Sequence, residues 1–412
     1  MPTPAPSSSR PTAQTPAERP GLSTFRAEAH AFVATHHPLR DGAESPSDAD
    51  FSVLPEKPAE LERRELAQAL AWRRTAYDAG FGWIDGPTRF GGRELPASYA
   101  AAYRDVERLF DVPDEAYTRF SVAILCPTML SHASDDLQRD MLPGLRRADV
   151  VACQLFSEPD AGSDMASART RARREGDTWV VDGQKVWTSG AHYSQVGLLL
   201  ARTEAGSRRN AGLSAFLIDM DQPGIEVRPI RQLTGGASFS EVFLDGARVP
   251  DSRRVGDLGS GWQVISTTMR YERAIIGTDG GVDLLLARRL VDLARARECW
   301  DDPGIRDVVG EVVARGRATA LMTQRFLDDA DESGVPGPEM SLSKLMLTDN
   351  LLRISAAAQR ILGTGFATDS GEAATYAWHQ LALTVEGLRT GGGTDEIMRT
   401  IVAQRVLGLP RS

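Results

Sequence analysis

One glutamate lies where a carboxylate can accept a proton. Glu272 belongs to the segment MRYERAII, residues 269–276, which has the composition of a helix. On a helix, Ile265, Met269 and Glu272 follow one another at i, i+4 and i+7, so the carboxylate falls on the apolar stripe. Burial there raises the pKa of a carboxyl group towards a value that suits a general base. The alternative interpretation is a structural ion pair with a neighbouring arginine.

Two segments in the middle of the chain carry groups that suit a polar ring or an anion. Cys153–Asp164, CQLFSEPDAGSD, leaves a β-like run and enters a turn rich in Pro, Gly and Ser. Such a turn presents backbone N–H groups and hydroxyls, although a plain surface turn is the alternative. Val186–Gly190, VWTSG, places an indole beside two hydroxyls, which suits stacking near a flavin and hydrogen bonding to its ring. The alternative there is a tryptophan that closes the core at a strand end.

A glycine-rich segment near the C-terminus allows a ligand to approach the backbone closely. Arg389–Arg399, RTGGGTDEIMR, contains three consecutive glycines. Thr394 is placed to cap the helix that follows, with Glu396 in its first turn. Dinucleotide-binding, phosphate-loop and serine-hydrolase motifs are absent. Ser341–Lys344 matches SxxK, but it lies within a predicted helix and lacks the companion motifs, so we interpret it as a coincidence.

The composition excludes several other functions. The chain has 412 residues and a formal net charge of -9, which argues against a nucleic-acid partner. The three cysteines are widely spaced, so we expect neither a disulfide framework nor a zinc site, and a cytoplasmic location fits best. The six histidines lack metal-ligand spacing, and we expect no metal. We expect no membrane span, because no apolar run is long enough.

The periodicity of the sequence predicts the elements that position these segments. Residues 1–20 are rich in Pro, Ser and Thr, which predicts a disordered tail. Residues 21–150 predict an N-terminal helical domain, and residues 256–412 return to helical periodicity. Between them, residues 151–255 contain short strand-like runs, including a hairpin with its turn at the Asp-Gly pair 182–183. The order predicts the α+β class, with a small central barrel or sandwich.

Taken together, the four segments resemble the acyl-CoA dehydrogenase family. CQLFSEPDAGSD is similar to the flavin-contacting strand and turn of that family, and VDGQKVWTSGA to its hairpin with a Trp-x-Thr flavin contact. YERA matches the helix position that one branch of the family uses for its base. RTGGGTDEIMRTIVAQRVLGL is similar to the C-terminal flavin loop and helix. The resemblance runs from about Gly21 to Leu409, and it implies FAD between a central β-domain and a C-terminal four-helix bundle.

The resemblance also implies roles for individual residues. Contacts to the flavin or its ribityl chain fall to Phe156, Ser157, Gly162 and Ser163. The residues that face the isoalloxazine are Trp187, Thr188 and Ser189, and those near the adenosine end are Thr394 and Glu396. Glu272 is the implied catalytic base. Substrate contacts fall to Ser163, Arg273, Gly392 and Gly393.

Two departures from the family pattern qualify these assignments. Many members carry the catalytic glutamate just before the final Gly-Thr, where this chain has Gly392, so the base is expected at Glu272. Glu386 is a distant second candidate. In Arg295–Arg306, RARECWDDPGIR, Arg297 is only an approximate match to the arginine that reaches a partner's FAD, and the accompanying phenylalanine is missing. This departure leaves open a heteromeric partner that supplies part of the site.

The resemblance implies FAD-dependent α,β-dehydrogenation of an acyl-CoA thioester. It further implies electron-transfer flavoprotein as the acceptor and a homodimer or homotetramer as the assembly. Three alternatives stay open from the sequence. They are a dehydrogenase of carrier-protein-bound acyl thioesters, a flavin monooxygenase or oxidase on the same fold, and a subunit of a heteromeric dehydrogenase.

Overall fold

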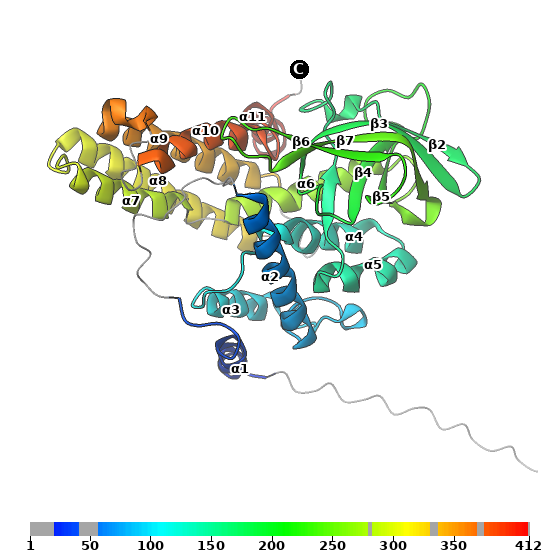
Figure 1. Cartoon of the computed structure of the whole chain (residues 1–412), viewed down its shortest axis with the longest axis horizontal. Helices are drawn as coiled ribbons and strands as arrows, with labels where there is room; N and C mark the ends of the chain where they lie inside the picture. The colour runs from blue at the N-terminus through cyan, green and yellow to red at the C-terminus, as the bar shows by residue number, and fades with distance from the viewer. Residues whose placement is uncertain (1–19, 41–56, 279–281, 330–336, 369–374, 411–412) are drawn as a thin grey trace, which may run out of the picture. The chain divides into compact units, whose positions relative to one another are not determined.

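The computed structural model of the chain describes residues 20–40, 57–278, 282–329, 337–368 and 375–410 (Figure 1). The predicted tail, residues 1–20, lies outside the described residues except for Pro20. The chain forms two compact units. Residues 1–40 and 79–112 make up the first, and residues 41–78 and 113–412 make up the second.

The first unit is helical and has an aromatic core. Its α-helices are α1, Leu22–Ala34, and α3, Ala97–Glu107. Phe25 is fully buried on α1, and its ring packs against those of Phe81 and Tyr99 at centroid distances of 5.8 and 5.1 Å. Aromatic pairs of this kind contribute beyond the area that they bury, which explains how so short a unit holds together.

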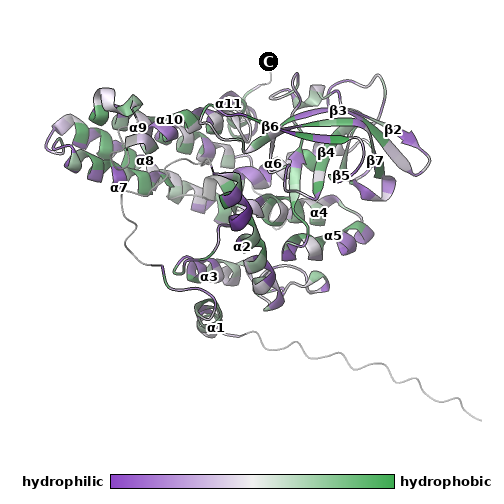
Figure 2. Cartoon of the chain, viewed as in Figure 1, coloured by the Kyte–Doolittle hydropathy of each residue, from purple (hydrophilic) through white to green (hydrophobic). Residues whose placement is uncertain are grey.

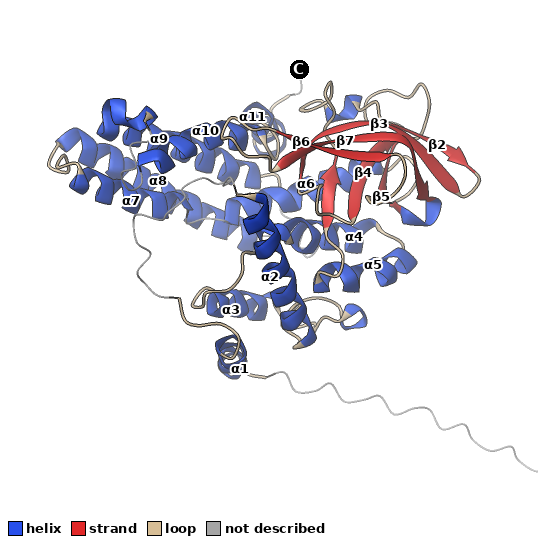
Figure 3. Cartoon of the chain, viewed as in Figure 1, coloured by secondary structure: helices blue, strands red, loops and turns tan. Residues whose placement is uncertain are grey.

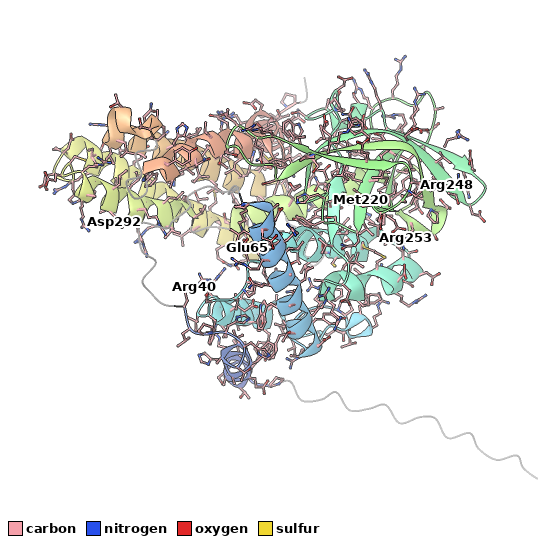
Figure 4. The ribbon with its side chains drawn as sticks, viewed as in Figure 1. Arg40, Glu65, Met220, Arg248, Arg253 and Asp292 are labelled. Carbon is pink, nitrogen blue, oxygen red and sulfur yellow. The ribbon has the colours of Figure 1, made fainter. Side chains whose placement is uncertain are left out.

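The second unit begins with three helices, namely α2, Ala59–Asp78; α4, Cys126–His132; and α5, Asp135–Arg147. Glu65 on α2, labelled in Figure 4, accepts hydrogen bonds from Lys57 Nζ at 2.6 Å and from Tyr117 Oη at 2.9 Å. Arg253, also labelled there, pairs with Asp219 at 3.3 Å at the end of the β-domain. The first contacts tie α2 to Lys57 and Tyr117, and the last ties the end of one strand of the sheet to the segment before its final strand.

A single eight-stranded sheet forms the centre of this unit (Figure 3). The first four strands are β1, Ala152–Leu155; β2, Arg171–Glu175; β3, Thr178–Ser189; and β4, Val196–Arg202. The last four are β5, Leu213–Asp219; β6, Ile225–Ile230; β7, Phe239–Pro250; and β8, Arg254–Val255. Their order is β6-β7-β3-β2-β4-β5-β8, and β1 pairs with β4 in parallel. The predicted central β-domain is confirmed.

The sheet owes its stability to two strands that are apolar on both faces. Six consecutive residues of β4 and six of β5 are buried, and β4 appears as a hydrophobic ribbon in Figure 2. Phe216, Leu199 and Trp179 belong to the core cluster of the sheet. Because α6 begins beside β5, the sheet and the helix that carries Glu272 are packed directly together. A Cβ at Gly261, the first residue of α6, would lie 2.7 Å from the backbone of Ser214.

The predicted hairpin turn at residues 182–183 is wrong. Strand β3 continues through these residues, and the turn with β2 lies instead at Gly176 and Asp177. The register against β7 shifts between Val181 and Gly183, which marks an irregularity of the bulge type. A Cβ at Gly183 would lie 2.4 Å from Thr170 Oγ1, so the glycine serves a close approach of two backbones rather than a turn.

The C-terminal part is helical, as predicted. It contains α6, Gly261–Thr278; α7, Val282–Ala296; α8, Pro303–Asp328; α9, Met340–Leu362; α10, Thr375–Thr390; and α11, Asp395–Ile401. Helices α7 to α10 share one core that includes Leu290, Val312, Leu351 and Trp378. This core corresponds to the expected four-helix bundle. The turn between α10 and α11 carries the glycine-rich segment.

Candidate active site

Glu272 lies on α6, and its neighbours include Gln154 of β1 and Lys344 of α9. Its side chain is partly buried and accepts a hydrogen bond from Gln154 on β1. Burial raises the pKa of the Glu272 carboxyl, although Arg273, Gln154 and Lys344 act in the opposite direction. The carboxylate is therefore desolvated but not isolated. This combination suits a group that must exchange a proton near neutral pH.

Arg273, the next residue on α6, is almost fully buried. Burial lowers the pKa of its guanidinium, whereas Glu272 raises it. Its Nε atom has no hydrogen-bond partner within the protein. A buried donor without a partner is costly, so this atom is available to a ligand oxygen. The substrate contact that the resemblance implies for Arg273 stays a prediction.

The turn after β1 is held by a buried ion pair. Lys185 Nζ on β3 donates to the Phe156 carbonyl at 2.9 Å and to Glu158 Oε1 at 2.8 Å. Glu158 also accepts from the backbone N–H groups of Arg169 and Thr170 at 2.6 and 2.9 Å. Although burial raises the pKa of Glu158, Lys185 and the donors of Thr170 and Arg169 together outweigh it and hold that pKa below its usual range. The segment is thus a built turn rather than a loose surface loop.

The predicted flavin contacts on this turn differ in their surroundings. Phe156 is buried, Ser157 is partly buried, and Gly162 and Ser163 are exposed on the outer part of the turn. The Ser157 carbonyl accepts from the Val186 N–H at 2.9 Å, which joins this turn to the segment that contains Trp187. The structure therefore brings the two central segments together.

The VWTSG segment is shaped by an irregularity at its tryptophan. Trp187 has φ of +60° and 60% of its surface is exposed, while its ring meets Phe239 edge-on at 6.1 Å. The register between β3 and β7 shifts here, between Lys185 and Thr188. Trp187 therefore does not close a core at a strand end. The shift turns its indole outward, beside the exposed Ser189.

Two buried hydroxyls beside Trp187 provide a test of whether a flavin fits. Thr188 is 1% exposed and Ser240 is fully buried, and the two residues face each other across β3 and β7. Neither Thr188 Oγ1 nor Ser240 Oγ has a hydrogen-bond partner in the protein. Buried hydroxyls are normally satisfied, so this pair indicates a polar ligand edge, as the flavin ring offers. The residues present fit the group.

Removal of the Thr188 hydroxyl is expected to separate ligand binding from folding. In Thr188→Val the cofactor-free protein should be as stable as the wild type or slightly more stable, because an unsatisfied buried hydroxyl is removed. FAD affinity should fall about tenfold, the equivalent of one hydrogen bond of about 1.4 kcal/mol. Thermal melting of the cofactor-free protein and FAD titration measure the two effects. Unchanged FAD affinity would reject the contact.

The glycine-rich turn is positioned from α9. Lys344 Nζ donates to the Arg389 carbonyl at 3.0 Å, to the Gly393 carbonyl at 2.5 Å and to Asp395 Oδ1 at 3.3 Å. Gly392 and Gly393 have φ of +66° and +97°, which favours glycine. A Cβ on Gly393 would also lie 2.5 Å from Met398 Cε. The turn is therefore both conformationally restricted and anchored.

The remaining predicted residues of this region behave as ordinary helix-start residues. Thr394 caps α11, with its Oγ1 accepting from the Ile397 N–H at 3.2 Å. Glu396 is exposed, and hydrogen bonds from its own backbone N–H and from Thr394 lower its pKa. Glu386, the second candidate for the base, is exposed and pairs with Arg389 at 3.1 Å. That location does not favour Glu386 as a base.

Comparison with known proteins places this geometry in a family. Residues 153–247 match the model of the acyl-CoA dehydrogenase middle domain, and residues 259–407 match that of the C-terminal domain. The chain is 38% identical over 359 residues to the acyl-CoA dehydrogenase IpdE1 of Mycobacterium tuberculosis, covering 85% of this chain and 90% of the relative. The chain belongs to the acyl-CoA dehydrogenase family.

Solved structures agree with this membership of the acyl-CoA dehydrogenase family. A structure titled Tcur3481-Tcur3483 steroid ACAD is 26% identical, with a TM-score of 0.75, and the match covers 96% of this chain and 99% of that one. The ChsE4-ChsE5 complex from Mycobacterium tuberculosis shares the fold at 22% identity and a TM-score of 0.73, with coverage of 97% and 100%. The predicted family, fold and class of enzyme, an oxidoreductase, are confirmed.

Three residues of the candidate site escaped sequence reasoning. Gln154 and Ser240 carry no signal in the sequence, since each is one polar residue in a strand. Lys344 belongs to the SxxK match interpreted as a coincidence, and it lies in the first turns of α9 rather than in mid-helix. A signal for Lys344 did exist, because lysine is rare in this chain.

The aromatic residue of the segment Arg295–Arg306 is Trp300. The Trp300 ring lies between the guanidinium groups of Arg295 and Arg306, at 5.7 and 5.6 Å. Arg306 also donates to the Trp300 carbonyl at 2.9 Å. These two arginines are therefore engaged with their own chain at the link between α7 and α8.

Within the described ranges, no group of three or more His, Cys, Asp or Glu side chains has the arrangement of a metal site. The three cysteines are free, and two of them are buried. Among the helices of the described residues, none combines the length and apolar character of a membrane span.

Proposed function

We propose that this chain catalyses FAD-dependent α,β-dehydrogenation of an acyl-CoA thioester, with Glu272 as the base. The observation that supports the proposal is the partly buried Glu272 carboxylate, which lies against β1 and within the field of Lys344 beside the glycine turn. Gly392 leaves no carboxylate at the other position that the family uses. Both features favour a base on α6.

Different residues of the chain have different proposed roles in the reaction. Glu272 takes the α-proton of the thioester, and Arg273, Gln154 and Lys344 favour its ionised form. Thr188 and Ser240, whose hydroxyls lack partners in the protein, would donate to the polar edge of a bound isoalloxazine. A bound flavin supplies the acceptor for the hydride that leaves the β-carbon. Partial burial of Glu272 reduces the hydration of the carboxylate and raises its pKa.

We further propose that the acyl group is bulky and contains rings. A solved structure of 26% identity is titled a steroid ACAD. The turn Gly391–Gly393 carries no side chains that would narrow the proposed reaction centre. The electron acceptor is proposed to be an electron-transfer flavoprotein, and the location cytoplasmic, in line with the free cysteines.

A thioester screen tests this function. The purified FAD-loaded protein is mixed anaerobically with straight-chain, branched and steroid-derived acyl-CoA thioesters, and flavin bleaching is followed. Rapid bleaching by ring-containing thioesters is expected. Failure of every thioester to bleach the flavin would reject dehydrogenation. Equal bleaching by carrier-protein thioesters, or fast reoxidation by oxygen, would favour the alternatives named from the sequence.

A heteromeric assembly is a second proposal. Two structural relatives have titles that name pairs of chains. In the present chain, Arg295 and Arg306 are engaged with Trp300, and no phenylalanine lies in this segment. We therefore propose that a related subunit completes part of the FAD site. FAD retention by the chain purified alone, compared with the chain co-expressed with an acyl-CoA dehydrogenase from its own genome, tests this point.

A further inference from the structure

The distribution of lysine in this chain singles out two positions. Only three of the 47 basic residues are lysine: Lys57, Lys185 and Lys344. Lys185 and Lys344 are both completely buried. Lys185 donates to one backbone carbonyl and Lys344 to two, each donates to one carboxylate, and each does so on a segment of the proposed site. Lys185 serves the turn after β1, and Lys344 serves the glycine turn.

The geometry at Lys344 suits a lysine side chain better than an arginine side chain. Its three acceptors, on Arg389, Gly393 and Asp395, converge on a single nitrogen. An ammonium group offers three donors around one atom, whereas a guanidinium presents a planar fork that needs more room. An arginine at this position would not place three donors on one nitrogen, as these three acceptors require. A lysine at position 344 is therefore suited to hold the glycine turn.

Asp395 completes the anchor from the other side. Its Oδ1 accepts from Lys344 and also from Thr348 Oγ1 at 3.1 Å, while its Oδ2 accepts from Arg389 Nε at 3.1 Å. The groups come from α9, from the end of α10 and from the start of α11. A buried ion pair with additional hydrogen bonds fixes one geometry, because any other arrangement leaves a charge unpaired.

The same ammonium acts on Glu272. Helix α6 packs against α9, and Lys344 and Glu272 each favour the charged form of the other. The charged groups that face the pair are Arg273 on α6, Asp395 and Glu396 on α11, and, around Arg273, Arg270 and Arg405. Among these charged groups, Lys344 both donates to the glycine turn and favours the ionised form of Glu272.

We propose that Lys344 is a positioning residue of the active site, which holds the glycine turn in place and presents a positive charge to Glu272. The inference rests on the proposed function, since it concerns the base of that reaction. The reaction needs both roles at once. The glycine turn must keep its conformation, and the Glu272 carboxyl group must stay ionised.

Two substitutions at the anchor are expected to act in opposite directions. Lys344→Met removes a positive charge, so the pKa of Glu272 should rise. Asp395→Asn removes a negative charge, so the pKa of Glu272 should fall. The carboxylic acid stretch of Glu272, identified by its loss in Glu272→Gln, is followed against pH by infrared difference spectroscopy in the full-length, cofactor-free protein. This readout does not depend on turnover.

A second readout addresses the turn. Hydrogen exchange of the peptide that spans residues 390–394 should be at least tenfold faster in Lys344→Met, because two carbonyls and a carboxylate lose their donor. Flavin reduction in the FAD-loaded variants then reports the catalytic consequence. Its acid limb should move to higher pH in Lys344→Met and to lower pH in Asp395→Asn.

The outcomes separate this inference from the proposed function. Opposite displacements of the Glu272 titration, with faster exchange in the turn, support the inference. Equal titration in both variants, or displacement in the same direction, would overturn it, as would unchanged exchange in Lys344→Met. If Lys344→Met does not fold, the direction of the shift in Asp395→Asn decides. If the shifts appear but Glu272→Gln still reduces flavin, the proposed base is wrong and the electrostatic coupling stands.

Discussion

Glu272→Gln is expected to retain FAD and to lose about 10²- to 10⁴-fold in the rate of flavin reduction by substrate, the usual contribution of a general base. Glutamine keeps the shape of the side chain and its hydrogen bond with Gln154, but it cannot take a proton. Stopped-flow bleaching of the flavin at saturating substrate measures the loss. A matched substitution, Glu386→Gln, changes an exposed carboxylate on α10 and should stay close to the wild-type rate.

The pH dependence of the same reaction follows from the surroundings of Glu272. Burial raises its pKa above the usual value for glutamate, so the ionised base is lost as the pH falls through that raised value. Wild-type flavin reduction should therefore decline on the acid side at a higher pH than an ordinary glutamate would give. The acid limb should be missing from the residual rate of Glu272→Gln. A wild-type profile that stays flat down to pH 4 would contradict the assignment.

Glu158→Gln is expected to lower the free energy of unfolding by about 3–5 kcal/mol, because it leaves the buried Lys185 ammonium without its carboxylate. Lys185→Met should cost a similar amount, since Glu158 would keep only its backbone donors. Urea denaturation of the cofactor-free protein measures both. Glu175→Gln, which alters an exposed pair on β2, is the control and should change stability little.

The contribution of Glu158 also has a defined pH window. Its pKa is lower in the folded protein than in the unfolded chain, so its stabilising effect is complete above the unfolded pKa and disappears as the pH falls through the folded one. The wild type and Glu158→Gln should therefore converge in stability under acid conditions. A constant difference at every pH would show that the ion pair is not responsible for it.

The sequence predicted the elements of this protein because their periodicity is strong. The short strand-like runs expected within residues 151–255 are strands in the structure, among them β4, β5 and β6. The hairpin turn failed because an Asp-Gly pair is equally compatible with an irregular position inside a strand. That choice depends on Thr170, which approaches Gly183 from the segment before β2. Local sequence contains no information about this approach.

The candidate site divides in the same way. Glu272 was predictable because a carboxylate on an apolar helix stripe conflicts with local rules, and such conflicts mark functional positions. Gln154 was not, and the rarity of lysine marked Lys344 without indicating its role, because both roles depend on which strand and which helix meet α6. The buried lysines of β3 and α9 each hold a turn that comes from another part of the chain, which local sequence does not indicate. Tertiary contacts supply this part of the site.

The central claim is that the Glu272 carboxylate removes the α-proton of an acyl thioester. Its most direct test is the exchange of that proton with solvent deuterium, measured by mass spectrometry on an acyl-CoA analogue whose β-carbon carries no transferable hydride. The FAD-loaded wild type is predicted to incorporate deuterium at the α-carbon, and Glu272→Gln is predicted not to do so. Exchange at the wild-type rate in Glu272→Gln would place the base elsewhere and contradict the account.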